Sequence, residues 1–201
     1  MSGSLTVVTG PMFAGKSTRL GYFLDNRRIE IDINSDKTTG FVAFNNPKVY
    51  NNEKDKNRRG NNPAIYTHSK KEYLAEWLGE YEIEFHLRHD LVDLIDYDIV
   101  IIDEVQFFRK QTIIAFVEAL QAKNCHVCVA GLAQDSYGKP FGAMGELMAM
   151  ADKIYLERAV CSVCGAQASR TQRLVKTEGT ILVGGESMFA PRCTYHWQAN
   201  P

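Results

Sequence analysis

The feature that most constrains this sequence is a glycine-bearing segment close to its N-terminus. The segment Gly10-Pro-Met-Phe-Ala-Gly15-Lys16-Ser17 matches the pattern G-x-x-x-x-G-K-[ST] at every defined position. In this pattern, the glycines let backbone N–H groups surround phosphate oxygens at a helix N-terminus, the lysine contacts the β- and γ-phosphates, and the hydroxyl binds Mg²⁺. The segment therefore predicts a site for the phosphates of a nucleotide and their magnesium ion.

The residues on either side of this segment supply the context that a phosphate loop requires. Leu5 to Thr9 is a short run rich in β-branched residues and predicts a strand, while Lys16 to about Arg28 predicts a helix. The glycine-bearing turn falls between the two. An ordinary glycine turn is the alternative interpretation, and the strand and helix beside it favour the phosphate loop.

The remaining apolar runs alternate between strand and helix patterns. Tyr97 to Asp103 is a continuous apolar stretch of the kind found in strands buried on both faces of a parallel sheet. Further strands are expected at Phe41 to Phe44 and His126 to Ala130, and helices at Lys110 to Lys123 and Gly145 to Ala151. Helical patterns also cover Lys70 to Leu78 and Leu91 to Ile95, and the stretch from Asn45 to Pro63 predicts a loop. The alternation predicts an α/β fold with a parallel sheet flanked by helices.

Two acidic residues stand at the end of the most apolar predicted strand. In a parallel sheet, the carboxyl ends of the strands face the ligand, so Asp103 and Glu104 are expected beside the phosphate loop. Asp103 suits the shell of a magnesium ion, and Glu104 suits a base that removes the proton of an attacking hydroxyl. A solvated strand end is the alternative, and the presence of the phosphate loop favours the acid site.

Two pairs of potential metal ligands occur in the last quarter of the chain. Cys161-x-x-Cys164 and Cys193-x-x-His196 have the internal spacing of a tetrahedral zinc site. Because four protein ligands leave no open position, the zinc is expected to be structural. Two unrelated buried thiols with a surface histidine are the alternative interpretation.

The same region marks a change in composition that predicts a second, smaller domain. Glycines and the paired ligands punctuate short strand-like pieces at Gln172 to Val175 and Thr180 to Val183. We therefore expect a nucleotide-binding domain over residues 1–157 and a zinc-binding domain over residues 158–201.

Length, composition and charge favour a globular protein with a buried core. The 201 residues with 45% hydrophobic content allow a buried core, and the apolar runs are too short to span a bilayer. The net charge of −1 gives no general reason to expect a nucleic-acid partner, and we expect a cytoplasmic protein without a membrane partner. Cys125 and Cys128 share a C-x-x-C spacing, but their place in an apolar strand predicts core packing.

Taken together, these motifs give the chain a resemblance to the zinc-containing thymidine kinase family. Four segments are similar to family motifs: Gly10-Pro-Met-Phe-Ala-Gly-Lys-Ser-Thr18, Asp103-Glu-Val-Gln-Phe-Phe108, Gly138-Lys-Pro-Phe-Gly142, and Val183-Gly-Gly-Glu-Ser-Met-Phe189 with Pro191-Arg-Cys193. The last resembles the family's lasso, which closes over the nucleoside. The likeness covers nearly all of the chain.

This resemblance implies a P-loop NTPase of RecA-like fold with a zinc-binding lobe that carries the lasso. It implies ATP as donor, thymidine as acceptor, Glu104 as general base for the 5′-hydroxyl, and a homotetramer. The nucleotide site would comprise Gly10, Pro11, Met12, Phe13, Ala14, Gly15, Lys16, Ser17, Thr18 and Asp103, with Arg58 or Arg59 at the phosphates. Met12, Phe141, Thr171, Val183, Gly184, Gly185 and Phe189 would surround the nucleoside.

The acceptor side departs from the family pattern at three positions. The family's acid after the Gly-Leu of the strand end and its aromatic a few residues on are replaced by Ala133 and Ser136, and Phe189 stands where a tyrosine is common. Either Tyr137 takes the place of the aromatic or the pocket is wider and accepts other deoxynucleosides.

We therefore expect transfer of the γ-phosphoryl of ATP to the 5′-hydroxyl of thymidine, with deoxyuridine as a second substrate. A RecA-like ATPase acting on nucleic acid is the main alternative, because it would share the loop and the acids. A zinc-ribbon interaction module with a nucleotide switch is the other, and Glu104 beside Asp103 argues against it.

Overall fold

A single parallel sheet organises the chain. The computed structural model describes residues 3–33, 39–43, 83–87, 97–176 and 187–199. Within these residues, six strands pair in the order β3-β2-β4-β5-β1-β6, and every pairing is parallel. The strands are β1 (Ser4–Thr9), β2 (Thr39–Ala43), β3 (Ile83–Leu87), β4 (Ile99–Asp103), β5 (His126–Gly131) and β6 (Lys153–Leu156). The α/β fold expected from the alternating pattern is confirmed.

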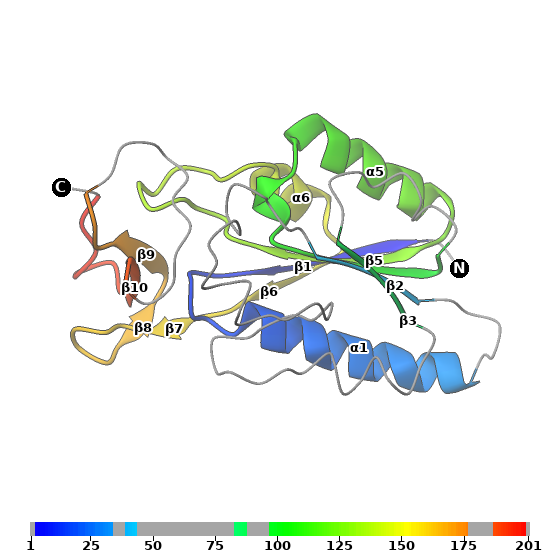
Figure 1. Cartoon of the computed structure of the whole chain (residues 1–201), viewed down its shortest axis with the longest axis horizontal. Coiled ribbons are helices and arrows are strands. Elements are labelled where there is room, and N and C mark those ends of the chain that lie inside the picture. The colour runs from blue at the N-terminus through cyan, green and yellow to red at the C-terminus, as the bar shows by residue number, and fades with distance from the viewer. Residues whose placement is uncertain (1–2, 34–38, 44–82, 88–96, 177–186, 200–201) are drawn as a thin grey trace.

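Helices cover both faces of this sheet. Figure 1 shows α1 (Lys16–Ile33) on one face and α5 (Lys110–Ala122) with α6 (Met144–Met150) on the other. A short 3₁₀ helix, η2 (Val105–Phe107), connects the end of β4 to the loop before α5. A parallel sheet needs this double cover, because both faces of its strands carry apolar side chains.

The central strands and α5 both contribute side chains to the core. Their apolar residues follow different spacings in the sequence. All five residues of β4 are buried, as its continuous apolar run predicts. In α5 the buried residues are Ile113, Phe116, Val117 and Leu120, a spacing that gathers them on one side of a helix. Burying a side chain of this size contributes roughly 1.5–3 kcal/mol. The core cluster between the sheet, α5 and α6 therefore fixes the position of the β4 and β5 ends, where the polar residues stand.

Most predicted element bounds agree with the structure to within a few residues. Helix α1 runs beyond the expected end at Arg28, to Ile33. Strands β3 and β6 were not predicted, and β6 is a four-residue, largely exposed edge strand with little apolar pattern. The expected helices at Lys70 to Leu78 and Leu91 to Ile95, the loop from Asn45 to Pro63 and the strand at Thr180 to Val183 lie outside the described residues.

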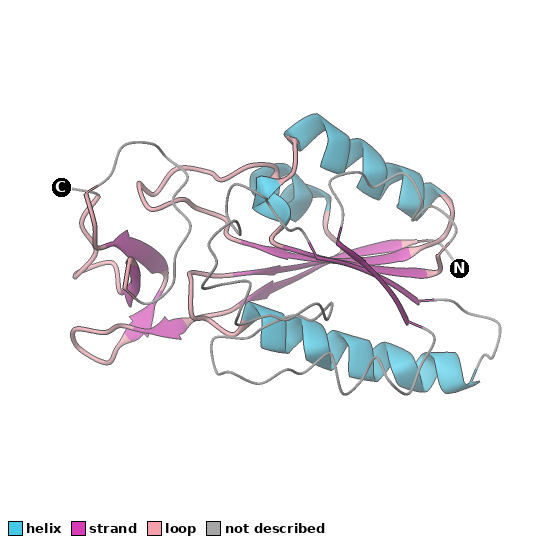
Figure 2. Cartoon of the chain, viewed as in Figure 1, coloured by secondary structure: helices cyan, strands magenta, loops and turns pink. Residues whose placement is uncertain are grey.

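Beyond one end of the sheet the chain forms a small lobe of short strands, seen at the left of Figure 2. Here β7 (Ala159–Val160) pairs with β8 (Gln167–Ala168), and β9 (Arg170–Arg173) pairs with β10 (Phe189–Arg192), both antiparallel. The expected strand at Gln172 to Val175 is thus displaced by two residues.

The lobe is joined to the phosphate-loop segment by an apolar contact. Ala14 of that segment clusters with Ala159, Cys161 and Ala168 of the lobe. The division into domains of residues 1–157 and 158–201 stays a prediction. Within the residues described, no helix combines the length and apolar character needed to cross a lipid bilayer.

Candidate active site

The glycine-bearing segment forms the turn between β1 and α1, as the sequence predicts. Gly10 has φ 155° and Gly15 has φ 80°, conformations that residues with a Cβ rarely adopt. A Cβ on Gly10 would also lie 2.4 Å from the carbonyl oxygen of Glu157, which follows β6. The close approach of these two chain segments therefore requires glycine at position 10.

Lys16 and Ser17 begin α1 and point their polar atoms toward the loop and the sheet. The Lys16 ammonium donates to the carbonyl oxygen of Pro11 at 2.9 Å. The Ser17 hydroxyl donates to Asp103 Oδ2 at 3.2 Å, across the gap between α1 and the end of β4. The structure thus brings together a phosphate loop and an acid that are 86 residues apart in sequence.

Asp103 is a buried carboxyl in a charged environment. Burial raises its pKa, as does the negative charge of Glu104, while the Glu104 backbone N–H, the charge of Lys16 and the Ser17 hydroxyl lower it, which leaves a pKa of about 7. Burial also lowers the pKa of Lys16, against the opposing effect of the two acids. Oxygen ligands of this kind suit Mg²⁺. Serine hydroxyls and aspartate carboxylates are among the oxygen donors that such an ion takes in phosphate-loop proteins.

Glu104 adopts an unusual backbone conformation where β4 ends. Its φ of 52° and ψ of 38° place it in the left-handed region, which is uncommon for residues with a Cβ. Its backbone N–H donates to Asp103 Oδ1 at 2.8 Å, and its Oε2 accepts a hydrogen bond from Gln106 Nε2 at 2.6 Å. The turn therefore separates the two neighbouring acids, with Asp103 buried against α1 and Glu104 partly exposed.

The loop after β5 brings an aromatic pair beside these acids. Asp135 Oδ1 accepts the backbone N–H groups of Tyr137 and Lys139, both at 2.9 Å, and so shapes the turn. The loop ends at Phe141, whose ring meets that of Phe107 edge to face with centroids 5.5 Å apart. Phe107 lies three residues after Glu104 in η2. This half of the site has an apolar wall next to the acids.

The other predicted nucleoside residues fall into two groups. The Met12 backbone N–H donates to Thr171 Oγ1 at 3.0 Å, which joins the phosphate loop to β9, and Phe189 is buried in β10. Val183, Gly184 and Gly185, together with Arg58 and Arg59, lie outside the described residues.

A cavity of about 360 Å³ lies beside the start of the phosphate loop. Its walls include Gly10, Pro11, Ala133, Gln134, Arg170 and Thr171. The small side chain at Ala133 therefore borders open space. Ser136, the other departure from the family pattern, is buried, and Tyr137 is half-buried.

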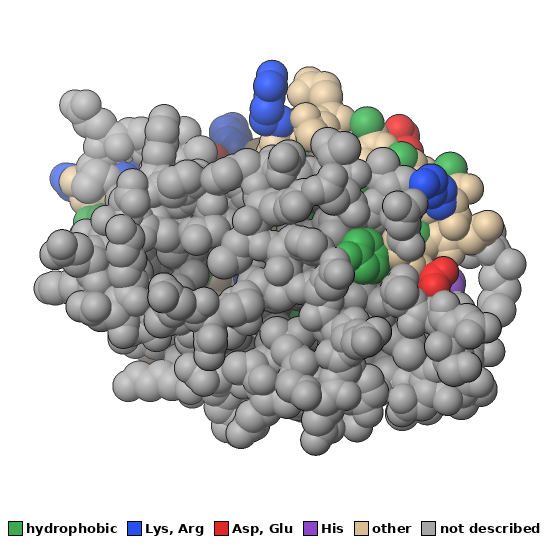
Figure 3. Space-filling model, turned by 45° about the vertical axis from the view of Figure 1, so that its right-hand side comes forward, with side chains coloured by type: hydrophobic (Ala, Val, Ile, Leu, Met, Phe, Trp, Pro, Cys, Tyr) green, Lys and Arg blue, Asp and Glu red, His purple; other side chains and the backbone are tan. Residues whose placement is uncertain are grey.

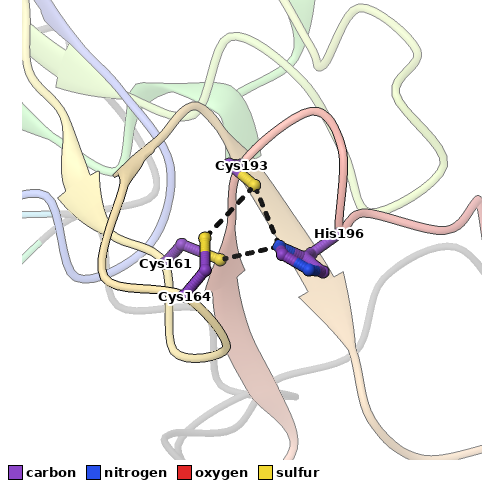
Figure 4. A group of neighbouring side chains, drawn as sticks. All are labelled: Cys161, Cys164, Cys193 and His196. Atoms are coloured by element: carbon purple, nitrogen blue, oxygen red, sulfur yellow. Dashed lines mark hydrogen bonds between the residues drawn. The ribbon is translucent and has the colours of Figure 1, made fainter.

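The four predicted zinc ligands converge in the small lobe, as Figure 4 shows. The distances are 3.9 Å from Cys164 Sγ to Cys193 Sγ, 3.3 Å from Cys193 Sγ to His196 Nδ1 and 3.9 Å from Cys161 Sγ to His196 Nδ1. Tetrahedral zinc with bonds of about 2.0–2.3 Å requires ligand atoms roughly 3.3–3.8 Å apart. The donor set and its spacing are compatible with a structural zinc ion.

The local electrostatics favour metal binding at this cluster. Burial acts to raise the pKa of the Cys161 thiol, but backbone N–H groups of Cys193, Val163 and Cys164 outweigh it and lower this pKa to about 6. Because the thiolate is the form that binds a metal, Cys161 is prepared to act as a ligand near neutral pH.

Trp197 connects the metal-ligand cluster to β9 and to the loop after β5. It follows His196, and its indole N–H donates to the carbonyl oxygen of Thr171 at 3.3 Å. A Cβ on Gly138 would lie 2.9 Å from the Trp197 ring, so the loop after β5 packs closely against it. Arg170 stacks over the same ring at 5.3 Å and donates to Gln134. The lobe is thus fastened to the loop that carries Phe141.

Sequence reasoning missed Gln106, Phe107 and Trp197, which make these connections. Gln106 and Phe107 stand in the family-like segment after Asp103, and that proximity was the available signal. Trp197 had only its place next to a predicted zinc ligand. The prediction that Cys125 and Cys128 pack in the core is confirmed, since both side chains are fully buried. Burial, with a contribution from the charge of Asp98, raises the pKa of Cys125 to about 12.

A parallel sheet, a phosphate loop between β1 and α1, and paired acids at the end of β4 define a nucleotide-binding enzyme of the phosphate-loop class. The sequence model of the family described as thymidine kinase matches residues 3–197. A thymidine kinase from Aster yellows witches'-broom phytoplasma (strain AYWB) is 32% identical over 200 residues, which cover 96% of this chain and 86% of that protein. The chain belongs to the thymidine kinase family.

The raised pKa of Asp103 predicts a pH dependence of stability in the nucleotide-free protein. An unperturbed aspartate titrates near about 3.9, so between about pH 4 and 7 the folded protein keeps a proton that the unfolded chain has released. The free energy of unfolding should therefore fall as pH rises through that window. Denaturant unfolding of Asp103→Asn should show a flatter profile than the parent. A control with Glu118→Gln, at an exposed site in α5, should retain the parent slope, and an unchanged slope in Asp103→Asn would contradict the assignment.

The metal-ligand cluster predicts that the chain binds zinc through these four residues. Loss of a cysteine elsewhere should leave the zinc content unchanged. Cys164→Ser removes one ligand at an exposed position and should lose most of the bound zinc, with a lower Tm, because the ion holds the lobe together. Cys128→Ala removes a core thiol and should retain one zinc ion per chain. Elemental analysis of both purified variants makes the comparison. Equal zinc contents would show that the cluster does not hold the ion.

Proposed function

We propose that this thymidine kinase transfers the γ-phosphoryl group of ATP to the 5′-hydroxyl of thymidine and thereby serves thymidine salvage for DNA synthesis. The observation that carries the proposal is the 3.2 Å hydrogen bond between Ser17 and Asp103, with Glu104 as the next residue. It joins the phosphate loop to a pair of acids at one edge of the sheet. Residues at that edge could bind the donor phosphates and a metal ion and could accept the proton of the acceptor hydroxyl.

The donor half of the site would hold ATP by its phosphates. Backbone N–H groups of the loop, from Gly10 to Thr18, and the Lys16 ammonium neutralise the triphosphate charge as it shifts toward the leaving oxygen. Ser17 and Asp103 would hold Mg²⁺, which when bound adds further positive charge at the β- and γ-phosphates. Arg58 or Arg59 remains our candidate for an additional cation at the phosphates.

The acceptor half would activate the sugar hydroxyl. Glu104 accepts the proton of the 5′-hydroxyl as that oxygen forms its bond to the γ-phosphorus, and the bond to the bridging β,γ-oxygen breaks to release ADP. Holding both substrates in line is the larger contribution, because the reaction is sensitive to orientation.

The nucleoside would lie between the loop after β5 and the lobe. Four described residues support this placement: Met12, Phe141, Thr171 and Phe189, which come from four different segments. Val183, Gly184 and Gly185 complete the proposed pocket. An apolar pocket closed by backbone groups can select a pyrimidine edge and exclude water, which would otherwise compete for the phosphoryl group.

Further parts of the proposal rest on the sequence patterns and on the family resemblance. We assign a structural zinc to Cys161, Cys164, Cys193 and His196, and a separate domain to residues 158–201. We also expect a homotetramer that acts in the cytoplasm.

The alternative of an ATPase acting on nucleic acid is not favoured by the family match over residues 3–197. On the face shown in Figure 3, acidic and basic side chains both occur among the described residues. A groove for single-stranded nucleic acid would call for a concentration of basic side chains interleaved with aromatic ones.

Removal of the proposed base gives the most direct test of the chemistry. Glu104→Gln keeps the size of the side chain but cannot accept the hydroxyl proton, so kcat should fall about 10²- to 10⁴-fold with little change in the KM for ATP. Steady-state assays of thymidine phosphorylation provide the measurement, and Glu118→Gln serves as the matched exposed control. Near-normal thymidine phosphorylation in a variant that still binds ATP would remove Glu104 from this role.

Substrate breadth tests the acceptor half separately. We expect phosphorylation of thymidine and deoxyuridine and little of purine deoxynucleosides, measured side by side with ATP as donor. If Tyr137 replaces the missing aromatic, Tyr137→Ala should raise the KM for thymidine about tenfold, as expected for one lost ring contact. Exclusive use of purines would overturn the nucleoside pocket while leaving the kinase chemistry intact.

A further inference from the structure

Gln106 makes two hydrogen bonds that connect different parts of the site. Its side chain is 3% exposed and lies in η2, two residues after Glu104. Nε2 donates to Glu104 Oε2 at 2.6 Å, and Oε1 accepts the backbone N–H of Leu132 at 3.1 Å. Leu132 is the first residue after β5. One amide thus bridges the proposed base and the start of the loop that leads to Phe141.

The orientation of this amide follows from the chemistry of its two neighbours. A backbone N–H such as that of Leu132 can only donate, so it must meet the carbonyl oxygen of the Gln106 amide. The NH₂ group is then directed at Glu104, which has to act as the acceptor. An ionised carboxylate is an acceptor only, and that is the form a general base requires.

Two glycines pack directly against Gln106. A Cβ on Gly131 would lie 2.5 Å from Gln106 Oε1, and one on Gly142 would lie 2.3 Å from the Gln106 carbonyl oxygen. The end of β5 and the end of the following loop therefore both pack against Gln106.

The backbone of Glu104 needs such support. Its left-handed conformation is disfavoured for a residue with a Cβ and persists where the surroundings determine it. The Phe107 backbone N–H donates to the Glu104 carbonyl oxygen at 3.1 Å, and the Gln106 amide fixes the carboxylate end of the same residue. Main chain and side chain of Glu104 are thus both restrained from η2.

We propose that Gln106 is a positioning residue that holds the Glu104 carboxylate in register with the loop after β5, an inference that rests on the proposed role of Glu104 as base. The amide fixes the distance between the proton acceptor and the segment that presents the nucleoside. A shift of this carboxylate relative to the 5′-hydroxyl lowers the rate without affecting the donor phosphates.

Gln106→Glu tests this role with the smallest chemical change. The new carboxylate keeps an acceptor for Leu132 but loses the donor toward Glu104 and adds a second negative charge beside it. We expect kcat to fall about 10- to 100-fold, the usual effect of losing a hydrogen bond to a charged group, with the KM for ATP within about twofold of the parent. Gln111→Glu makes the same change at an exposed site in α5 and should have no effect.

A double-mutant cycle separates positioning from a general structural role. If Gln106 acts through Glu104, then adding Gln106→Glu to Glu104→Gln should change the residual kcat by less than about twofold. An equal loss in both backgrounds, or a parent-like kcat in Gln106→Glu alone, would overturn the inference. Should Gln106→Glu fail to bind ATP, Gln106→Met carries the same cycle without the added charge. A fully active Glu104→Gln would instead refute the proposed base.

Discussion

The site depends on burying the Asp103 carboxyl beside the Lys16 ammonium at the carboxyl edge of a parallel sheet. A buried charge is costly unless it is paired and hydrogen-bonded. Here the Ser17 hydroxyl and the backbone N–H of Glu104 bond Asp103, and Lys16 supplies the opposite charge. Burial raises the pKa of Asp103 to about 7. A nearby cation would favour the ionised form of this carboxyl. The positive charge of a bound magnesium ion would offset the cost of burying this carboxylate.

This arrangement requires the doubly covered parallel sheet. β5 lies between β1 and β4, so Asp103 reaches Ser17 across the end of one intervening strand. The apolar cluster beneath α5 and α6 fixes those strand ends relative to one another. Flexibility at the β4 end would separate the acid from the loop. A well-packed core is therefore a condition for the site geometry as well as for stability.

The sequence was sufficient for those parts of the protein whose chemistry is encoded locally. The phosphate loop and the two ligand pairs of the metal cluster have fixed residue spacings. The strand that ends in Asp103 is a continuous apolar run. The connections between them could not be predicted, because Gln106, Phe107 and Trp197 act on partners that only the fold brings near. β6 was missed for a related reason: its few residues carry little apolar pattern, and its place in the sheet comes from pairing with β1.

The contacts of the small lobe explain how a metal cluster distant from the phosphates can influence the reaction. Where the chain enters the lobe, the Glu157 backbone N–H donates to Thr9 at 2.7 Å and its carbonyl lies against Gly10. Farther on, Thr171 receives the Met12 N–H and Trp197 packs on the loop after β5. These contacts join the lobe to the phosphate loop and to the loop after β5. A zinc ion bound by this cluster would keep Trp197 and β9 in place, and under the proposed function it would thereby influence the distance between donor and acceptor.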